Sequence, residues 1–396
     1  MNNEAQPLSW DAQRPENALT LPSSYFYDPE IFASEKERIF MGAWHFACHI
    51  NELPEAGAFV VRDVFDQSVI IMRDQQGELN AFHNVCQHRG NRLLNEKSGV
   101  QKGVIRCAYH SWCYGADGQL KAAPRSNRIE AFNVDDFKIP AVRLQVFASC
   151  VYFNFDPQAT DMEELFPGAE QAIREAIPQL DDMRLIQEDD VIVPANWKVI
   201  MDNSIEGYHF QLSGPHHVDL AALVDFSDYK LRQFDNWWTY GAPPNRDATE
   251  AYGEPIGRDV ENGDGFFNIG LWPHNTLYQF PFSQCLGTFM IIPLDAERSI
   301  LRFGYYSPHA ELPNVTRACI DWMNNDLGPE DLELNETVQK GLHSLGYQQG
   351  RYMIDAERSN ESEHLVLHFH RLVYRALHGS APASAQQGAA QQEAAQ

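Results

Sequence analysis

The first half of the chain alternates hydrophobic and polar residues with a period of two. The segments AFVVRDVF, SVIIMRD and ELNAFHNV follow one another between residues 58 and 85, and VFASCVYFNF continues the pattern further along. Such alternation is typical of half-buried β-strands joined by tight turns. We therefore predict a small antiparallel β domain over residues 41–156. Ahead of it, Asp28 as N-cap and Pro29 at the first helical position predict a helix over EIFASEKERIF.

From about residue 157 the pattern changes to helical spacing mixed with strands such as FGYYSP and LWPHNTLYQFPF. Helices are predicted from Asn196, over VTRACIDWMNNDL and over HLVLHFHRLVYRAL, and Gly328-Pro329 should separate the second from a further helix, EDLELNETVQKGL. The fold class predicted is α+β, with the small antiparallel β domain followed by a larger domain of helices and antiparallel sheet at residues 157–379. We expect residues 1–40 to pack on this larger domain, and the Ala/Gln-rich tail, 380–396, to be disordered.

Composition and charge narrow the class of protein. The chain has 396 residues, of which 44% are hydrophobic and 21% charged, as in ordinary globular proteins. No stretch reaches the roughly 18 apolar residues of a membrane span, and the first twenty residues carry no apolar run, so we expect a cytoplasmic protein. A formal charge of −25 argues against nucleic acid as a partner and suits a cationic substrate or a basic redox partner, or serves solubility alone. Seven cysteines, an odd number, argue against a disulfide scaffold.

Two short cysteine–histidine pairs stand in the middle of the small domain. Cys86 and His88 form a C-x-H pair, and Cys107 and His110 form a C-x-x-H pair. Each pair offers one thiolate and one imidazole, whereas zinc sites usually open with two cysteines. The mixture favours a cluster of two unlike irons, in which two imidazoles replace two thiolates on one iron, as in a Rieske [2Fe–2S] centre. A structural zinc site is the alternative.

A second candidate metal site lies in NWKVIMDNSIEGYHFQLSGPHH. On a continuous helix, Asp202, Glu206 and His209 lie at i, i+4 and i+7 on one face, opposite an apolar stripe. That stripe consists of Trp197, Ile200, Met201, Ile205 and Tyr208. Two acids and an imidazole beside a pocket are costly unless they are paired or bind a metal. The alternative is a solvent-exposed polar face.

From about Ala43 to Leu377 the chain resembles the catalytic α subunit of the Rieske non-haem iron oxygenases. Arg89-Gly90 and the run from Ser111 to Gly115 match the flanks of the Rieske motif. That family also carries N-x-x-E/D-x-x-H, matched by Asn203, Glu206 and His209.

The two remaining iron ligands of the family are matched less directly. The second histidine usually follows the first by five residues, where this chain has Gly214. His216 and His217 are the candidates, and the H-x-D-L that begins at His217 favours the latter. The third ligand in the family is an aspartate before V-Q-x-G-L, matched by Asp331, with Glu330 and Asp326 as weaker candidates.

The resemblance implies two cofactors, a Rieske [2Fe–2S] cluster and a mononuclear non-haem Fe(II). Two histidines and one carboxylate leave one face of the iron open for O₂ and substrate. No G-x-G-x-x-G follows a strand, so the electrons must come from a separate NAD(P)H reductase of the flavin or ferredoxin type. In the family a head-to-tail homotrimer places one subunit's cluster beside the next subunit's iron. The acid that corresponds to Glu206 bridges a histidine of each.

Aromatic residues are dense in the segments that should form the pocket: Trp237, Trp238, Tyr240, Trp272, Tyr278, Phe280 and Phe282. The last three alternate, so one strand would place them on one face. Aromatic faces hold a quaternary ammonium by cation–π attraction, but they also fit a flat aromatic ring. We expect Asn203, Trp238, Tyr278 and Phe280 to contact the substrate.

The segments SIEGYHFQLSGP, WWTYGAPP and LWPHNTLYQFPF resemble the branch of the family that N-demethylates betaines such as stachydrine. The resemblance implies an oxidative N-demethylase: hydroxylation of an N-methyl carbon gives a carbinolamine, which releases formaldehyde. The alternative within the family is an aromatic-ring hydroxylating α subunit. A pure electron carrier and a zinc-stabilised binding protein are the alternatives outside it.

Overall fold

The computed structural model describes residues 10–256 and 265–379. The chain divides into two compact units, a smaller one of residues 41–188 with 304–310 and a larger one that holds the rest of the described chain. The tail 380–396, expected to be disordered, lies outside the described residues. The predicted α+β class is confirmed: small antiparallel sheets form the smaller unit, and helices with a large antiparallel sheet form the larger one.

The smaller unit contains three antiparallel sheets, with strand orders β1-β10-β9, β4-β3-β2-β5 and β6-β7-β8. Their strands are β1 (His45–His49), β2 (Ala58–Val64), β3 (Gln67–Arg73), β4 (Leu79–His83), β5 (Ser98–Val100), β6 (Ile105–Arg106), β7 (Cys113–Tyr114), β8 (Leu120–Ala122), β9 (Arg143–Phe147) and β10 (Cys150–Asn154). The three alternating segments predicted as strands are β2, β3 and β4. VFASCVYFNF folds back on itself as the hairpin β9–β10, because Ala148 and Ser149 both adopt positive φ at its two-residue turn.

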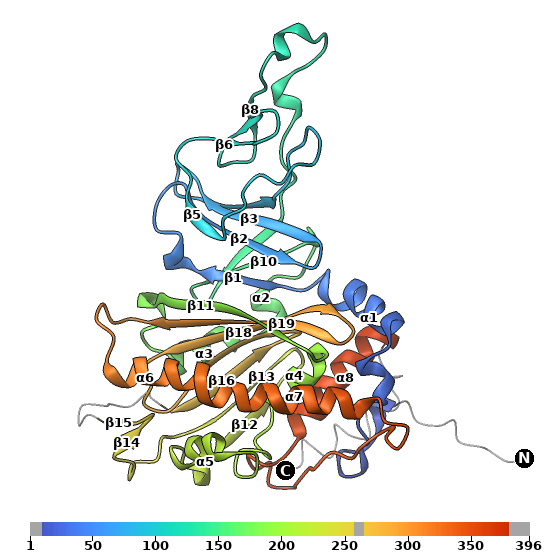
Figure 1. Cartoon of the computed structure of the whole chain (residues 1–396), viewed down its shortest axis with the longest axis vertical. Coiled ribbons are helices and arrows are strands. Elements are labelled where there is room, and N and C mark those ends of the chain that lie inside the picture. The colour runs from blue at the N-terminus through green and yellow to red at the C-terminus, as the bar shows by residue number, and fades with distance from the viewer. Residues whose placement is uncertain (1–9, 257–264, 380–396) are drawn as a thin grey trace, which may run out of the picture. The chain divides into compact units, whose positions relative to one another are not determined.

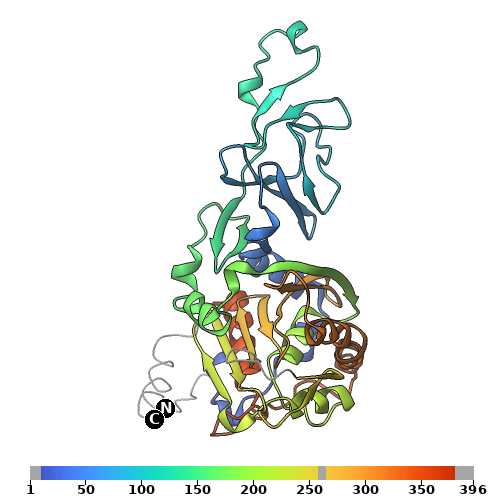
Figure 2. The ribbon, with the colours of Figure 1, turned by 90° about the vertical axis from the view of Figure 1, so that its left-hand side faces the viewer.

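The four-stranded sheet is buried on both faces. From β2 and β3, Val60 and Ile71 enter one apolar cluster, while Val61 and Ile70 enter another on the opposite face. The second cluster joins this sheet to Ile105, Tyr114 and Leu120 of the β6-β7-β8 sheet, drawn in teal beside the blue strands in Figure 2. The period-two pattern thus fixes which residues point to each of the two buried faces of the sheet. The cysteine–histidine loops pack on the second of these faces.

Residues 157–188 group with the smaller unit, although the sequence placed them in the larger domain. They contain α2 (Met162–Leu165) and α3 (Ala169–Ala176). Phe166 packs against Phe147 of β9 with ring centroids 6.4 Å apart, and the His49 imidazole contacts the Leu180 carbonyl at 3.0 Å. These contacts attach the segment to the β1-β10-β9 sheet.

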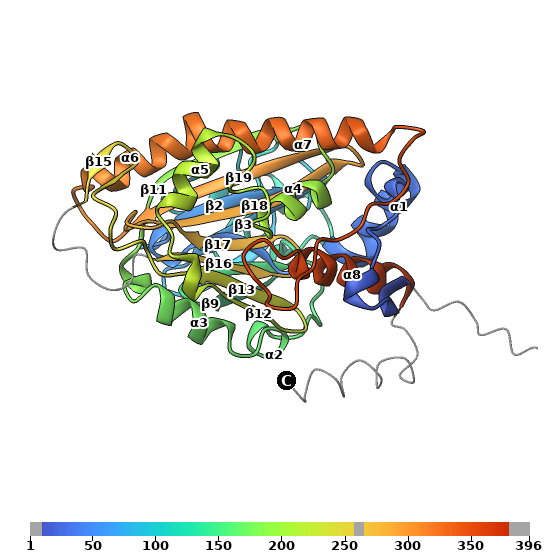
Figure 3. The same cartoon turned by 90° about the horizontal axis from the view of Figure 1, so that it is seen from below.

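A seven-stranded sheet of order β11-β19-β18-β17-β16-β13-β12 supplies most of the strands of the larger unit (Figure 1). Its strands are β11 (Arg184–Val193), β12 (Lys230–Gln233), β13 (Trp237–Ala242), β16 (Phe266–Leu271), β17 (Asn275–Gln279), β18 (Leu286–Asp295) and β19 (Arg298–Ser307), and β14 (Glu250–Ala251) and β15 (Glu254–Pro255) form a separate hairpin. The helices of this unit are α1 (Pro29–Glu35), α4 (Trp197–Ser204), α5 (Pro215–Ala222), α6 (Asn314–Trp322), α7 (Gly328–Leu342) and α8 (His364–His378). In Figure 3, α7 runs alongside α4 and α5, and α8 lies near α1.

Helix α4 begins as predicted but ends earlier. The Asn196 side chain caps it by accepting the Lys198 N–H at 3.0 Å. The helix stops at Ser204, whereas we predicted that it continues through His209, and Tyr208 is exposed rather than part of the apolar stripe. At Gly207 the chain passes so close to the Asn360 carbonyl that a Cβ there would lie 2.5 Å from that oxygen, so only glycine fits.

The predicted break at Gly328-Pro329 is wrong. Helices α6 and α7 are continuous through a wider, π-helical turn at Met323–Leu327. The wide turn accommodates Pro329, which has no N–H to continue the usual ladder. Gly328 fits because a Cβ there would lie 2.5 Å from the Met323 carbonyl oxygen. The result is that Glu330 and Asp331 stand in the first turn of α7.

A buried ion pair ties the amino-terminal segment to α4. Lys198 Nζ lies 2.6 Å from Glu35 Oε1, both side chains have no exposed surface, and the Trp197 indole donates to the other Glu35 oxygen at 2.8 Å. Burial lowers the pKa of Lys198, and the nearby Glu35 carboxylate opposes this. The pair fixes the start of the helix whose end leads to Glu206 and His209.

We predict that Glu35→Gln destabilises the larger unit by about 3 kcal/mol, because it leaves the Lys198 charge buried without its counter-charge. Calorimetric melting should show a lower transition temperature for this variant. The double variant Glu35→Gln/Lys198→Met should recover a large part of the loss. A single variant that melts like the wild type would show that the pair contributes nothing.

Candidate functional site

The two cysteine–histidine loops share one backbone geometry. In the first, the Cys86 N–H donates to the Asn91 carbonyl at 2.8 Å and the Gly90 N–H to the Cys86 carbonyl at 3.0 Å. The second repeats both bonds at the same spacing, from Cys107 to Trp112 and from Ser111 to Cys107, at 2.8 and 3.0 Å. The residue four positions after each cysteine has positive φ, 72° at Gly90 and 60° at Ser111. Each loop therefore turns its thiol inward and its imidazole outward.

The four side chains separate by type. Cys86 and Cys107 are buried in the core shared with the four-stranded sheet, and the His88 side chain is exposed. The two imidazoles approach each other, with Nδ1 atoms 3.1 Å apart, and the Trp112 indole stacks on His88 at a centroid distance of 4.9 Å. Two sulfurs inside and two imidazoles outside suit two unlike irons.

The Tyr114 hydroxyl lies 3.3 Å from Cys86 Sγ and accepts the Gln87 N–H at 3.0 Å, so its own proton points at the sulfur. Burial raises the pKa of the Cys86 thiol, while the hydrogen bond from Tyr114 lowers it. A donor to a sulfur ligand stabilises the thiolate that an iron would need.

The larger unit brings His209, His217 and Asp331 together, with one ligand atom of each within 4.8 Å of the others. His217 Nε2 lies 3.0 Å from Asp331 Oδ1, and His209 Nε2 lies 3.8 Å from the same oxygen. His209 comes from the loop after α4, His217 from α5, and Asp331 from the first turn of α7. Within residues 10–256 and 265–379, no other group of three such side chains is arranged to hold an ion. Two imidazoles and a carboxylate fit an iron with an open face.

A carboxylate stands behind each of these imidazoles. Glu206 contacts His209 Nδ1 and also accepts the backbone N–H groups of Tyr208 and His209. Glu330 lies 2.8 Å from His217 Nδ1 and accepts the His216 and His217 N–H groups at 3.3 Å. Burial lowers the pKa of His217, but Asp331 and Glu330 outweigh it and raise that pKa. Both Nδ1 atoms are engaged, so both Nε2 atoms are left for a metal.

Glu330 also explains why position 214 is not a histidine. A Cβ at Gly214 would lie 2.6–2.7 Å from the Glu330 carboxyl group, and Gly214 has a φ of 133°. The carboxylate occupies the space of a side chain there and caps α5 instead. His216, the competing candidate, points away: its nitrogens lie 3.9 Å from Asp219 and Asp326. Sequence reasoning weighed Glu330 only as a ligand and missed its role behind His217.

A cavity of about 110 Å³ opens beside the three side chains. Aromatic and aliphatic groups dominate its wall: Ile200, Phe210, Leu220, Tyr240, Phe266, Tyr278, Phe280, Phe289, Leu301, Phe303, Met323, Leu327 and Leu332. Asn203, Asn268 and Asn335 add polar amides. Of the predicted substrate contacts, Asn203, Tyr278 and Phe280 line this cavity.

Trp238 does not line the cavity, which corrects that prediction. It shares a sheet face with Tyr240 but lies further along β13, where α8 covers it, and its ring packs 6.3 Å from Phe369. The indole lies over Gly270, whose added Cβ would meet it at 2.2–2.4 Å. The alternating strand is also shorter than predicted, because β17 ends at Gln279 and Phe282 enters a separate apolar cluster.

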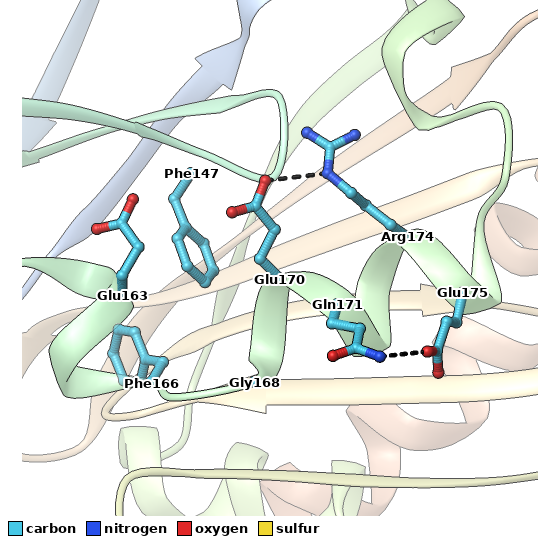
Figure 4. A pocket seen from close by; sticks show the side chains of 8 residues that line it. All are labelled: Phe147, Glu163, Phe166, Gly168, Glu170, Gln171, Arg174 and Glu175. Atoms are coloured by element: carbon cyan, nitrogen blue, oxygen red, sulfur yellow. Dashed lines mark hydrogen bonds and ion pairs between the residues drawn. The ribbon is translucent and has the colours of Figure 1, made fainter.

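A second hollow, beside α3 in the smaller unit, lacks a site of this kind (Figure 4). Its charged side chains are largely paired, Arg174 with Glu170 and Glu175 with Gln171, and its apolar wall is Phe147 and Phe166. Two histidines outside both candidate sites have ordinary partners. His49 caps the Asn51 N–H, and His364 contacts the Ser362 hydroxyl.

Comparisons with known proteins agree with both sites. The Rieske [2Fe-2S] domain family matches residues 43–133, and the catalytic domain of the ring hydroxylating alpha subunits matches residues 180–379. The carnitine monooxygenase oxygenase subunit of Escherichia coli K12 is 35% identical over 91% of this chain and 94% of its own. The chloroplastic choline monooxygenase of Beta vulgaris is 27% identical over 89% of this chain and 77% of its own.

Solved structures give the same result. The crystal structure of the quaternary ammonium Rieske monooxygenase CntA with L-carnitine aligns with a TM-score of 0.83 and 32% identity, over 94% of this chain and 99% of that one. Naphthalene 1,2-dioxygenase from Rhodococcus aligns with a TM-score of 0.77 at 18% identity, over 92% and 95% of the two chains, and shares the fold. In the described part of the chain, no helix is long and apolar enough to cross a membrane.

The predicted family is therefore confirmed: the chain belongs to the α subunits of the Rieske non-haem iron oxygenases, whose cofactors are a Rieske [2Fe–2S] cluster and a mononuclear iron.

Proposed function

We propose that the chain is the oxygenase component of a monooxygenase that acts on a small quaternary ammonium compound. The observation that carries this proposal is the wall of the cavity beside His209, His217 and Asp331. Seven aromatic rings line it, and no lysine or arginine does. Each aromatic face attracts a quaternary ammonium by about 0.5–2 kcal/mol, and the nearby carboxylates favour a cation further. The similarity to carnitine and choline monooxygenases, which are named for quaternary ammonium compounds, also supports this proposal.

In this proposal Cys86 and Cys107 hold one iron of the cluster, and His88 and His110 hold the other. His209, His217 and Asp331 hold the mononuclear iron, which when bound supplies O₂ activation at its open face. Glu206 and Glu330 orient the two imidazoles from behind. The aromatic wall binds the ammonium group and excludes water from the reacting carbon.

The reaction proposed is oxidative N-demethylation, with the betaine stachydrine as one candidate substrate. One oxygen atom of O₂ enters a C–H bond of an N-methyl group, and the other leaves as water after uptake of two electrons and two protons. The N-hydroxymethyl product breaks its C–N bond and releases formaldehyde, a proton and the tertiary amine. An aromatic-ring hydroxylase is the second candidate, and its only support in the cavity is the same set of rings.

The two electrons come from a separate flavin- or ferredoxin-type reductase in this proposal. Residues 86–128, which contain the cluster ligands, carry eight lysines and arginines against two acids, while the rest of the chain carries 22 against 53. His88, Arg89, Arg106 and Tyr109 are exposed there. This basic surface suits an acidic partner, rather than the basic one that the overall charge suggested.

We further propose that the chain acts as a head-to-tail homotrimer. Glu206 then extends from His209 to a cluster histidine of the neighbouring subunit. Inter-subunit electron transfer is described for the quaternary ammonium Rieske monooxygenase structure that this chain resembles at 31% identity. The contact of Glu206 with His209 Nδ1 supplies one half of such a bridge.

We predict that Asp331→Ala and His217→Ala lower the iron content from roughly three atoms per chain to roughly two, because the cluster keeps its pair of irons. The brown colour of the cluster should persist and turnover should stop. His216→Ala is the matched control and should keep its full iron content. Loss of iron from the His216 variant alone would move the ligand to that residue.

We predict that Glu206→Gln keeps both metal sites filled but slows reoxidation of the reduced cluster about 100-fold in a single turnover with substrate and O₂. Glu330→Gln is the matched control, since it removes the same charge from behind the other imidazole. The bridge requires the Glu206 variant to be slower than this control at equal iron content. Equal rates in the two variants would reduce Glu206 to an orienting residue.

We predict that the purified protein, with a surrogate reductase and NADH, releases formaldehyde from small quaternary ammonium compounds in a ratio of about one per O₂ consumed. Aromatic acids and naphthalene should give no hydroxylated product. Hydroxylation of the aromatic compounds without formaldehyde release from any ammonium compound would support the second candidate instead.

A further inference from the structure

One amide in the cavity wall, that of Asn268, has a buried oxygen without a hydrogen-bond partner in the described part of the chain. Asn268, on β16, is 5% exposed and lines the cavity. Its side-chain Oδ1 is buried and forms no hydrogen bond within the described part of the chain. A buried carbonyl oxygen without a partner costs about 1–3 kcal/mol, so such an atom in a binding cavity calls for a ligand that can donate to it.

The sheet places Asn268 between two tyrosines. Tyr240 of β13 and Tyr278 of β17 are its cross-strand partners, and paired residues of neighbouring strands project from the same face. The Asn268 amide therefore stands in a row of three side chains on the cavity side of the sheet.

Neither tyrosine hydroxyl donates to Asn268 Oδ1. The Tyr240 hydroxyl donates to the Ser204 carbonyl at 2.5 Å. The Tyr278 ring leans over Gly287 of β18, where an added Cβ would meet it at 2.2–2.5 Å. The two tyrosine rings thus stand on either side of the amide.

The charge of the cavity decides which polar group fits the amide. Asp331 lines the cavity, Glu206 and Glu330 lie behind its histidines, and no lysine or arginine is among the lining residues. A carboxylate next to Asn268 would have no lysine or arginine in the cavity wall to pair with it, which is costly. A hydroxyl is neutral, donates to Oδ1 and can accept from the amide N–H, so it matches either orientation of the amide.

We infer that Asn268 binds a hydroxyl group of the substrate, which makes the preferred substrate a quaternary ammonium alcohol rather than a betaine. This inference rests on the proposed function and narrows its substrate class. The ammonium group lies against the aromatic wall, and the hydroxyl reaches the amide between Tyr240 and Tyr278. Asn268 is then a specificity-determining residue that orients the substrate.

The test uses pairs of compounds that differ only at this group. Choline is compared with ethyltrimethylammonium, which lacks the hydroxyl, and with glycine betaine, which has a carboxylate in its place. For the full-length enzyme with a surrogate reductase, we expect kcat/KM for choline to exceed that for each comparison compound by about tenfold or more, because a site built for a hydroxyl rejects analogues that leave its amide unpaired.

Asn268→Ala should remove this preference, with the loss confined mainly to choline. Asn245→Ala, which truncates an amide of the larger unit outside the cavity wall, is the matched control and should keep the choline preference. Turnover of ethyltrimethylammonium and an unchanged cluster spectrum show that a variant is folded.

Three outcomes would overturn the inference. They are equal wild-type turnover of choline and ethyltrimethylammonium, a preference for glycine betaine, or a preference that survives in Asn268→Ala. If the wild-type enzyme turns over no quaternary ammonium compound, the proposed function itself fails. The two failures are therefore distinguishable.

Discussion

The proposed iron site depends on one repeated interaction, a carboxylate that binds a histidine at two points. Glu206 contacts both the backbone N–H and the Nδ1 of His209, and Glu330 does the same for His217. Two-point attachment fixes the imidazole orientation and its tautomer, so each Nε2 faces Asp331. The same two acids also shape the backbone. Glu206 accepts amides of the turn that follows α4, and Glu330 occupies the space that leaves only glycine at position 214.

This arrangement gathers negative charge around a small volume. Asp331, Glu206 and Glu330 all contact or approach the two histidines, and the cavity wall offers no cationic side chain. A divalent cation offsets most of that charge, and a cationic substrate adds to the balance, whereas an anion works against it. The carboxylates around the two histidines and the aromatic wall of the cavity therefore both favour a positively charged ligand.

Much of the fold, and the two loops that carry the proposed cluster ligands, could be predicted because their determinants are local. The strands β2, β3 and β4 follow a period-two pattern, and the four cluster side chains come from two short loops with matching turns. The iron site is harder, because its contacts join distant segments. Glu330 is 113 residues from His217 along the chain. Gly207 lies against Asn360, a contact that helical spacing alone does not reveal, so the predicted helix α4 was too long. Trp238 was misplaced for a similar reason: β13 has the predicted face, but α8 covers that end of it.

Basic and acidic residues are unevenly distributed along the chain. The segment with the cluster ligands is basic, while the rest of the chain is strongly acidic. A basic surface around exposed imidazoles attracts acidic surfaces, whether they belong to a reductase or to another copy of this chain. An acidic catalytic unit, in contrast, repels acidic redox proteins and attracts cations. One polypeptide therefore carries a basic segment and an acidic remainder. Under the proposed function, an acidic reductase and a cationic substrate would be attracted to different parts of the chain before any specific contact forms.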